Sequence, residues 1–127
     1  MESQWSLLKE IKVSNHNYIE ALAGVPADSP WFSGHFPGEP ILPGIALIYM
    51  AEQAIIQDAL AKGEKVQLHA LKRVRFTQPV RPGETLSLSI SGEEGEEADE
   101  EILFSFKVSN KENIVCSGAI VAKKINK

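Results

Sequence analysis

Apolar and polar positions alternate with two different periods along the chain. Over residues 43–62 the apolar residues recur at helical spacing and leave no wide polar face, a pattern typical of a buried helix. Pro43 in the first turn and Gly63 after the last turn are typical of helix ends. The pattern therefore predicts one long helix that is covered on nearly all sides.

Strand-like patterns precede and follow this helix. Leu86, Leu88 and Ile90 alternate with serines, the period of two expected for a strand with one buried face. Further short apolar runs predict strands within residues 8–24 (one or two strands), 66–76, 102–109 and 114–122. One helix followed by about four consecutive antiparallel strands predicts an α+β fold in which a curled sheet wraps the helix. The length of 127 residues fits a single domain, 1–127.

A sheet that wraps one helix leaves unpaired strand edges. Dimerisation that joins two sheets would pair such edges. We therefore expect a homodimer, and a higher oligomer stays open.

The charge is unevenly placed. The net charge is −4, and seven of the 17 acidic residues lie in residues 93–101, EEGEEADEE. This run is interpreted as a solvated hairpin loop or a disordered tip or, alternatively, as a segment that repels partners or binds metal. The acidic balance argues against nucleic acid as a partner.

Several sequence features indicate in which cell compartment we expect the protein. The N-terminus has no basic start followed by an apolar core, so no signal peptide is expected, and residues 41–61 are too polar for a membrane span. Cys116 is the single cysteine and sits in an apolar run, which favours a core thiol in a reducing cytoplasm. His16 and His69 lack metal-ligand spacing and are interpreted as surface or strand histidines.

The stretch SGHFPGEPILPG, residues 33–44, leads into the predicted helix with three prolines, three glycines and one histidine. Such backbone would hold His35 rigidly, and an imidazole takes or gives a proton near pH 7. Gly44 lies at the helix N-terminus, where a free N–H suits a carbonyl oxygen that gains negative charge. A base beside such a donor fits proton abstraction next to a carbonyl, while the alternative is a structural histidine in a tight turn.

This stretch resembles the signature of the β-hydroxyacyl-[acyl carrier protein] dehydratases, which has the form HFPGxPxxPG. Every fixed position is present: His35, Phe36, Pro37, Gly38, Pro40, Pro43 and Gly44. Residues 74–86, VRFTQPVRPGETL, are similar to the family's segment after the helix. The resemblance covers roughly residues 30–122.

The resemblance implies a hotdog fold that dimerises by joining two sheets. It implies that His35 abstracts the α-proton of a 3-hydroxyacyl thioester and that the Gly44 N–H holds the thioester carbonyl. It further implies that a carboxylate on the partner's helix protonates the departing hydroxyl. The substrate would be carried on phosphopantetheine of an acyl carrier protein, with no metal or organic cofactor. Further substrate-binding positions are Phe36, Pro37, Gly38, Pro43 and Gln53.

The sequence departs from the family at this carboxylate, fourteen residues after the histidine, where it has Tyr49. A tyrosine with a pKa of about 10 is a poor proton donor at neutral pH but can still hydrogen-bond a hydroxyl. Glu52 and Gln53 follow on the same side of the helix. We expect Glu52 or Tyr49 to be the acid-side group. The alternative is that Glu52 is paired with a basic group or lies at a wet interface.

The leading hypothesis is dehydration of 3-hydroxyacyl thioesters to trans-2-enoyl thioesters in fatty acid or related biosynthesis. Because of Tyr49, a non-catalytic acyl-binding or partner subunit is the alternative, and a hotdog thioesterase is less favoured. A basic set after the helix is either a solvated sheet edge or a docking patch for the carrier: Lys72, Arg73, Arg75 and Arg81.

Overall fold

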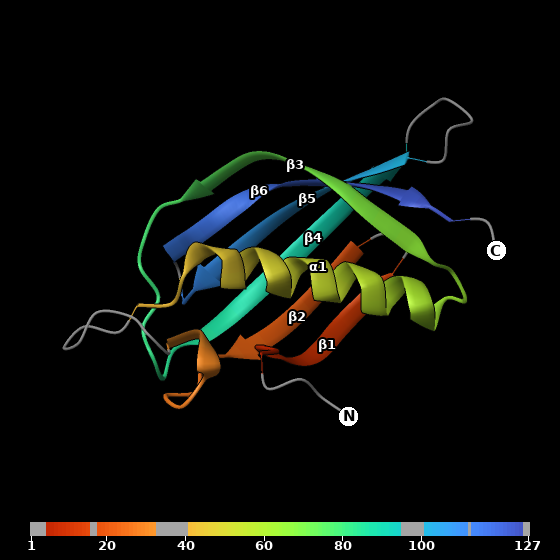
Figure 1. Ribbon diagram of the computed structural model, residues 1–127. Helices are drawn as coiled ribbons and strands as arrows, with labels where there is room; N and C mark the ends of the chain where they lie inside the picture. The colour runs from red at the N-terminus through yellow and green to blue at the C-terminus, as the bar shows by residue number, and fades with distance from the viewer. Residues whose placement is uncertain (1–4, 16–17, 33–40, 95–100, 112, 126–127) are drawn as a thin grey trace.

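The computed structural model describes residues 5–15, 18–32, 41–94, 101–111 and 113–125. A six-stranded antiparallel sheet curls around one helix (Figure 1). The strands are β1 (Leu8–Asn15), β2 (Tyr18–Gly24), β3 (Val66–Phe76), β4 (Thr85–Glu94), β5 (Glu101–Asn110) and β6 (Asn113–Lys124). The helix is α1 (Gly44–Ala61), and a short 3-10 helix, η1 (Pro30–Phe32), precedes it. The predicted α+β architecture is confirmed.

The strand order β1-β2-β4-β5-β6-β3 places β3 at the far edge of the sheet. The connection from β2 to β3 contains α1 and leads to the far edge, where β3 lies next to β6, and the next strand, β4, returns to the middle beside β2 (Figure 1). Among the described residues, β1 and β3 are therefore the two sheet edges. This connection between β2 and β3 lets the helix lie across one face of the sheet.

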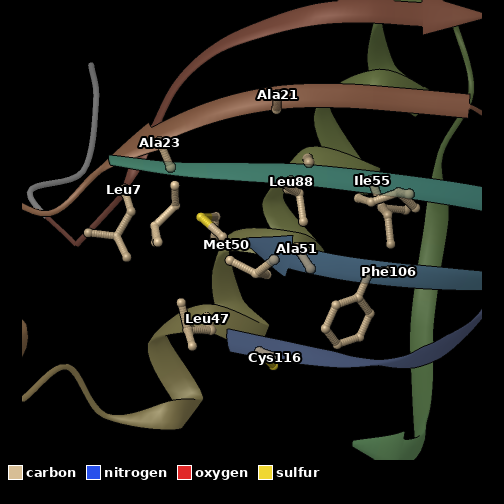
Figure 2. Packing of buried hydrophobic residues seen from close by; sticks show 14 of the residues in the cluster. Leu7, Ala21, Ala23, Leu47, Met50, Ala51, Ile55, Leu88, Phe106 and Cys116 are labelled. Atoms are coloured by element: carbon tan, nitrogen blue, oxygen red, sulfur yellow. The ribbon is translucent and has the colours of Figure 1, made fainter. Parts of the chain in front are cut away.

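The core lies between α1 and the concave face of the sheet. On β4 and β5 every second residue faces the helix, and Phe106 is only 2% exposed. Figure 2 shows helix side chains packed toward those of the central strands; the labelled residues include Leu47, Met50, Ala51, Ile55, Leu88 and Phe106. The apolar side chains at every second strand position and those on one side of α1 thus form one apolar layer.

The outer side of α1 is less covered than the sequence pattern predicts. Ile45 is 58% exposed and Leu60 is 56% exposed, and Ile56 is exposed as well. The expectation of a helix covered on nearly all sides is wrong for the single chain, because the sheet packs against only one side. The apolar outer side of α1 is therefore available to another surface.

The C-terminal end of α1 matches the sequence signal. Gly63 has φ +78°, a backbone conformation that glycine adopts without strain, and its N–H donates to Leu60 O at 3.0 Å. Lys62 pairs with buried Asp58 at 2.9 Å one turn earlier. Among the residues that the structure describes, no helix has both the length and the apolarity that crossing a membrane requires.

Candidate active site

The N-terminus of α1 presents free backbone donors. Pro43 occupies the N-cap position with φ −66° and ψ 147°, and a proline side chain cannot cap a helix. The Ala46 N–H donates to Pro43 O at 3.0 Å, whereas the Gly44 N–H has no acceptor among the described residues. The Leu42 N–H donates to Val80 O at 2.8 Å and anchors the approach to the helix. The positive end of α1 is thus held in place, and its Gly44 N–H is left without an acceptor among the described residues.

The ring of Phe76 lies directly against Gly44. A Cβ added to Gly44 would lie 2.7 Å from Cε1 and Cζ of Phe76. Phe76, at the end of β3, is itself 51% exposed. A hollow of about 540 Å³ adjoins the two residues and has a mainly apolar lining that includes Ile41, Leu42, Ile45, Pro79 and Val80. An apolar hollow beside a free N–H suits an acyl group attached to a carbonyl.

Four of the predicted site residues fall outside the described residues: His35, Phe36, Pro37 and Gly38. The same holds for His16. The role of His35 as a base therefore stays a prediction from the motif.

Tyr49, at the family's acid position, is half-buried and packs against Trp31 of η1. Their ring centroids are 5.9 Å apart. The indole N–H of Trp31 donates to Trp5 O at 2.7 Å, and the two indole rings meet edge to face at 4.9 Å. Sequence reasoning missed this contact, although Trp31 lies only four residues before His35. The aromatic cluster fixes one side of the Tyr49 ring.

Glu52 is a half-buried carboxyl that has no counter-charge beside it in the described part of the chain. Burial raises the pKa of Glu52, because desolvation disfavours its charged form. Among the described residues neither a hydrogen bond nor an ion pair involves its carboxylate. The alternative of structural pairing thus finds no partner in the described chain. A carboxyl that keeps its proton to higher pH is suited to donate that proton.

Gln53 adds a second unsatisfied polar group. Its Oε1 is buried and has no hydrogen-bond partner among the described residues. Tyr49, Glu52 and Gln53 all lie on the side of α1 that faces away from the core, and each is half-buried. A buried acceptor without a donor is costly, so a ligand or another chain is the natural source of a partner for Gln53.

The predicted basic set is split by the fold. Lys72, Arg73 and Arg75 are exposed on β3, whereas Arg81 lies in the loop before β4. Arg73 and Arg75 line a hollow together with Lys107 of β5, a residue that sequence reasoning missed. Lys107 is far from this set in sequence, and only the strand order brings it near.

The remaining candidates have structural roles. His69 is exposed, and its Nε2 lies 3.4 Å from Oε2 of Glu101. Cys116 is buried in the core, and burial raises the pKa of its thiol to about 11, so it is an unreactive thiol. Within the described part of the chain, no three His, Cys, Asp or Glu side chains are grouped to hold a metal ion.

Comparison with known proteins identifies related dehydratases. A family model described as ApeI-like, ApeI dehydratase, matches residues 10–119. The 3-hydroxyacyl-[acyl-carrier-protein] dehydratase FabZ of Syntrophobacter fumaroxidans is 37% identical over 79 residues, covering 57% of this chain and 52% of the relative. This chain thus spans about half the length of the curated relatives it matches.

Solved structures confirm the hotdog fold. The dehydratase heterocomplex ApeI:P from Xenorhabdus doucetiae is similar at a TM-score of 0.69 and 25% identity, covering 92% of this chain and 96% of that chain. A hypothetical thioesterase with coenzyme A from Streptococcus pneumoniae reaches a TM-score of 0.74 at 13% identity, covering 93% of this chain and 89% of that chain. The second likeness concerns the fold alone.

Proposed function

Because this chain belongs to the ApeI-like family of dehydratases, we propose that it removes water from 3-hydroxyacyl thioesters to give trans-2-enoyl thioesters. The observation that carries the proposal is the helix mouth, where the Gly44 N–H has no acceptor among the described residues and Gly44 lines a mainly apolar hollow of about 540 Å³. A thioester carbonyl placed there would have its developing negative charge stabilised by the N–H and the helix end.

His35 is the proposed base, since the motif places it nine residues before Gly44. Its neutral imidazole takes the proton from the α-carbon, and the electrons of that C–H bond move toward the carbonyl that Gly44 holds. The α–β double bond then forms as the β-carbon loses its hydroxyl. The substrate-binding roles of Phe36, Pro37, Gly38 and Pro43 remain proposals.

Glu52 is the proposed acid. Its raised pKa keeps a larger share of the carboxyl protonated near neutral pH, so that it can give a proton to the departing hydroxyl, which leaves as water. Tyr49 and Gln53 lie within one turn of Glu52 and are proposed to hydrogen-bond the hydroxyl or the substrate. Water elimination breaks one C–H and one C–O bond with no net oxidation or reduction and needs only a base and an acid, so we propose no metal or organic cofactor.

The proposed active form is a dimer, and a higher assembly is compatible with it. A second subunit would cover the exposed apolar side chains of Ile45, Leu60 and Phe76 and could pair the free edge of β3. By resemblance to the dehydratases, the acid would come from the helix of the other subunit, so the site would be shared.

The proposed substrate is carried on the phosphopantetheine of an acyl carrier protein in the cytoplasm, in fatty acid or related acyl-chain synthesis. The exposed basic side chains of Lys72, Arg73, Arg75 and Arg81 are the proposed docking positions for an acidic carrier. Binding of carrier that weakens with added salt would support this role, and salt-independent binding would contradict it.

Hydration of a trans-2-enoyl thioester by the purified chain tests the proposal in the reverse direction. Wild type should hydrate the substrate, and His35→Ala should lose at least about a hundredfold in rate, the usual contribution of a general base. His69→Ala is the matched control, because His69 pairs with Glu101 on the surface, and it should retain the wild-type rate. Equal rates in His35→Ala and wild type would refute the assignment.

A second candidate is a subunit that depends on another hotdog protein for its acid. Tyr49 at the family's acid position favours it, and the similarity to a dehydratase heterocomplex is compatible with it. This reading predicts that the purified chain binds an acyl thioester without turnover and that activity appears when a carboxylate-bearing partner is added.

A further inference from the structure

The face of the sheet opposite α1 has its own hollow, of about 480 Å³. It lies across β3, β6, β5 and β4, and its cationic side chains are Arg73, Arg75 and Lys107. None of the described residues that line it is acidic, although the whole chain has a net charge of −4. Positive charge is therefore concentrated at one place on an acidic protein.

A β-bulge in β3 brings both arginines to this hollow. Lys72 is opposite Ala119 and Arg75 is opposite Ser117, so β3 has one extra residue in this interval. Arg73 has φ 55°, which is unusual for a residue with a side chain. Across from the bulge, a Cβ on Gly118 would lie 3.0 Å from Cγ2 of Val74, so the two strands pack closely here.

The three cations are not neutralised within the described chain. The ion pairs Asp58–Lys62 and His69–Glu101 do not involve a cation of the hollow. The nearby carboxylate of Glu20, cross-strand from Ser89, accepts a hydrogen bond from the Tyr18 hydroxyl at 2.6 Å. An anion entering the hollow would thus meet cations that hold no carboxylate.

The floor of the hollow supplies hydroxyl donors. Serines from three adjacent strands line it: Ser89, Ser91, Ser105 and Ser117. Cross-strand pairing places Ser89 next to Lys107 and Ser117 next to Arg75, so each of these cations has a hydroxyl beside it. Guanidinium groups with neighbouring hydroxyls match the several acceptor oxygens of a phosphate better than the two of a carboxylate.

We propose that this hollow binds a ligand that carries a phosphate or diphosphate group. Its volume is in the range of small-ligand sites rather than of broad protein interfaces. The hollow is separate from the helix mouth, because the buried layer of Ile90 and Phe106 lies between the outer face and α1. The phosphate can belong to a free nucleotide-type coenzyme or to phosphopantetheine on a carrier, since both present the same group.

Calorimetric titration with inorganic pyrophosphate tests the site. Wild type should bind saturably, more weakly as salt is added, and Arg75→Gln and Lys107→Gln should each raise the Kd at least fivefold. The matched control is Lys65→Gln, which removes one exposed charge before β3 and should leave the Kd unchanged. Thermal melts of the exposed-site variants verify that they are folded.

Two further arms distinguish the sources of the phosphate. ADP that competes with pyrophosphate identifies a nucleotide-type ligand, and holo-carrier that binds more tightly than apo-carrier identifies phosphopantetheine. Either result supports the proposal. The proposal would be overturned if wild type showed no saturable binding of pyrophosphate, or if wild type, Arg75→Gln and Lys107→Gln had equal Kd values. Equal binding of apo- and holo-carrier without any pyrophosphate binding would overturn it as well.

Discussion

Neighbouring residues of β5 serve opposite faces of one sheet. Phe106 points toward α1 and is 2% exposed, whereas Ser105 and Lys107 line the outer hollow. The inner face gains stability by removing large apolar side chains from water, and the outer face offers small hydroxyls and cations to solvent. Because side chains alternate along β5, residues that stabilise the fold lie on one face of the sheet and candidate binding residues lie on the other.

The largest expected effect concerns the folding role of the inner face. Phe106→Ala should lower the free energy of unfolding by about 3–5 kcal/mol, because it removes a buried ring and leaves a cavity. Ser105→Ala should change it by less than about 0.5 kcal/mol, as expected for a surface position. Chemical denaturation of both variants measures the difference, and similar losses would break the division of roles between the faces.

That division also explains what the sequence could predict. The alternation of Leu86, Leu88 and Ile90 and the helical spacing after Pro43 report burial, which depends on local pattern. The contact of Phe76 with Gly44 and the presence of Lys107 and Arg75 in one hollow depend on strand order and register instead. Nothing local in the sequence encodes them, so both were missed.

The motif and the helix show the same contrast within the candidate site. The HFPG signature and the position of Gly44 at the helix start were readable, because proline and glycine have fixed backbone consequences. The exposure of the outer side of α1 could not be predicted from the sequence, since its apolar residues resemble those of the buried side. Whether a second chain covers that side is a property of the assembly.

On the helix side, the next largest effect is expected from Glu52. Glu52→Gln should reduce turnover by about a hundredfold, because the departing hydroxyl loses its proton donor. The control Glu64→Gln changes an exposed carboxylate beyond α1 and should be silent. Steady-state kinetics on one thioester compare the two, and a Glu52→Gln rate equal to wild type would remove Glu52 from the mechanism.

The pH dependence sharpens the same assignment. Glu52 must be protonated to act as the acid, and its pKa is raised by desolvation, so wild-type dehydration should fall as pH rises through that raised pKa. In Glu52→Gln this limb of the profile should be absent. If the dehydration rate of Glu52→Gln fell with rising pH as in wild type, another group would be the one that titrates.

Gly44→Ala tests the helix mouth with a smaller change. The new methyl group would meet the ring of Phe76, which is half exposed and can rotate away, so stability should change little while turnover drops at least about tenfold. Adding Phe76→Leu to Gly44→Ala should restore part of the rate if crowding is the cause. Full activity of Gly44→Ala alone would contradict the close fit.

The smallest expected effect is that of Glu52→Gln on the free energy of unfolding. Because the folded-state pKa of Glu52 is raised above its unfolded value, wild type loses stability as pH rises through the folded pKa. Glu52→Gln should therefore be more stable than wild type at pH 7, by less than about 1 kcal/mol since solvent screens a half-exposed group, and equal near pH 4. Melts at the two pH values measure this; a larger advantage at pH 4 would reverse the sign.

The most direct test of the central claim is hydration of a trans-2-enoyl thioester in D₂O, followed by mass spectrometry. If the helix mouth performs reversible water elimination, the product is an intact 3-hydroxyacyl thioester with deuterium on the α-carbon, and His35→Ala forms almost none. Release of free thiol and carboxylic acid, or labelled product at the wild-type rate from His35→Ala, would contradict the account.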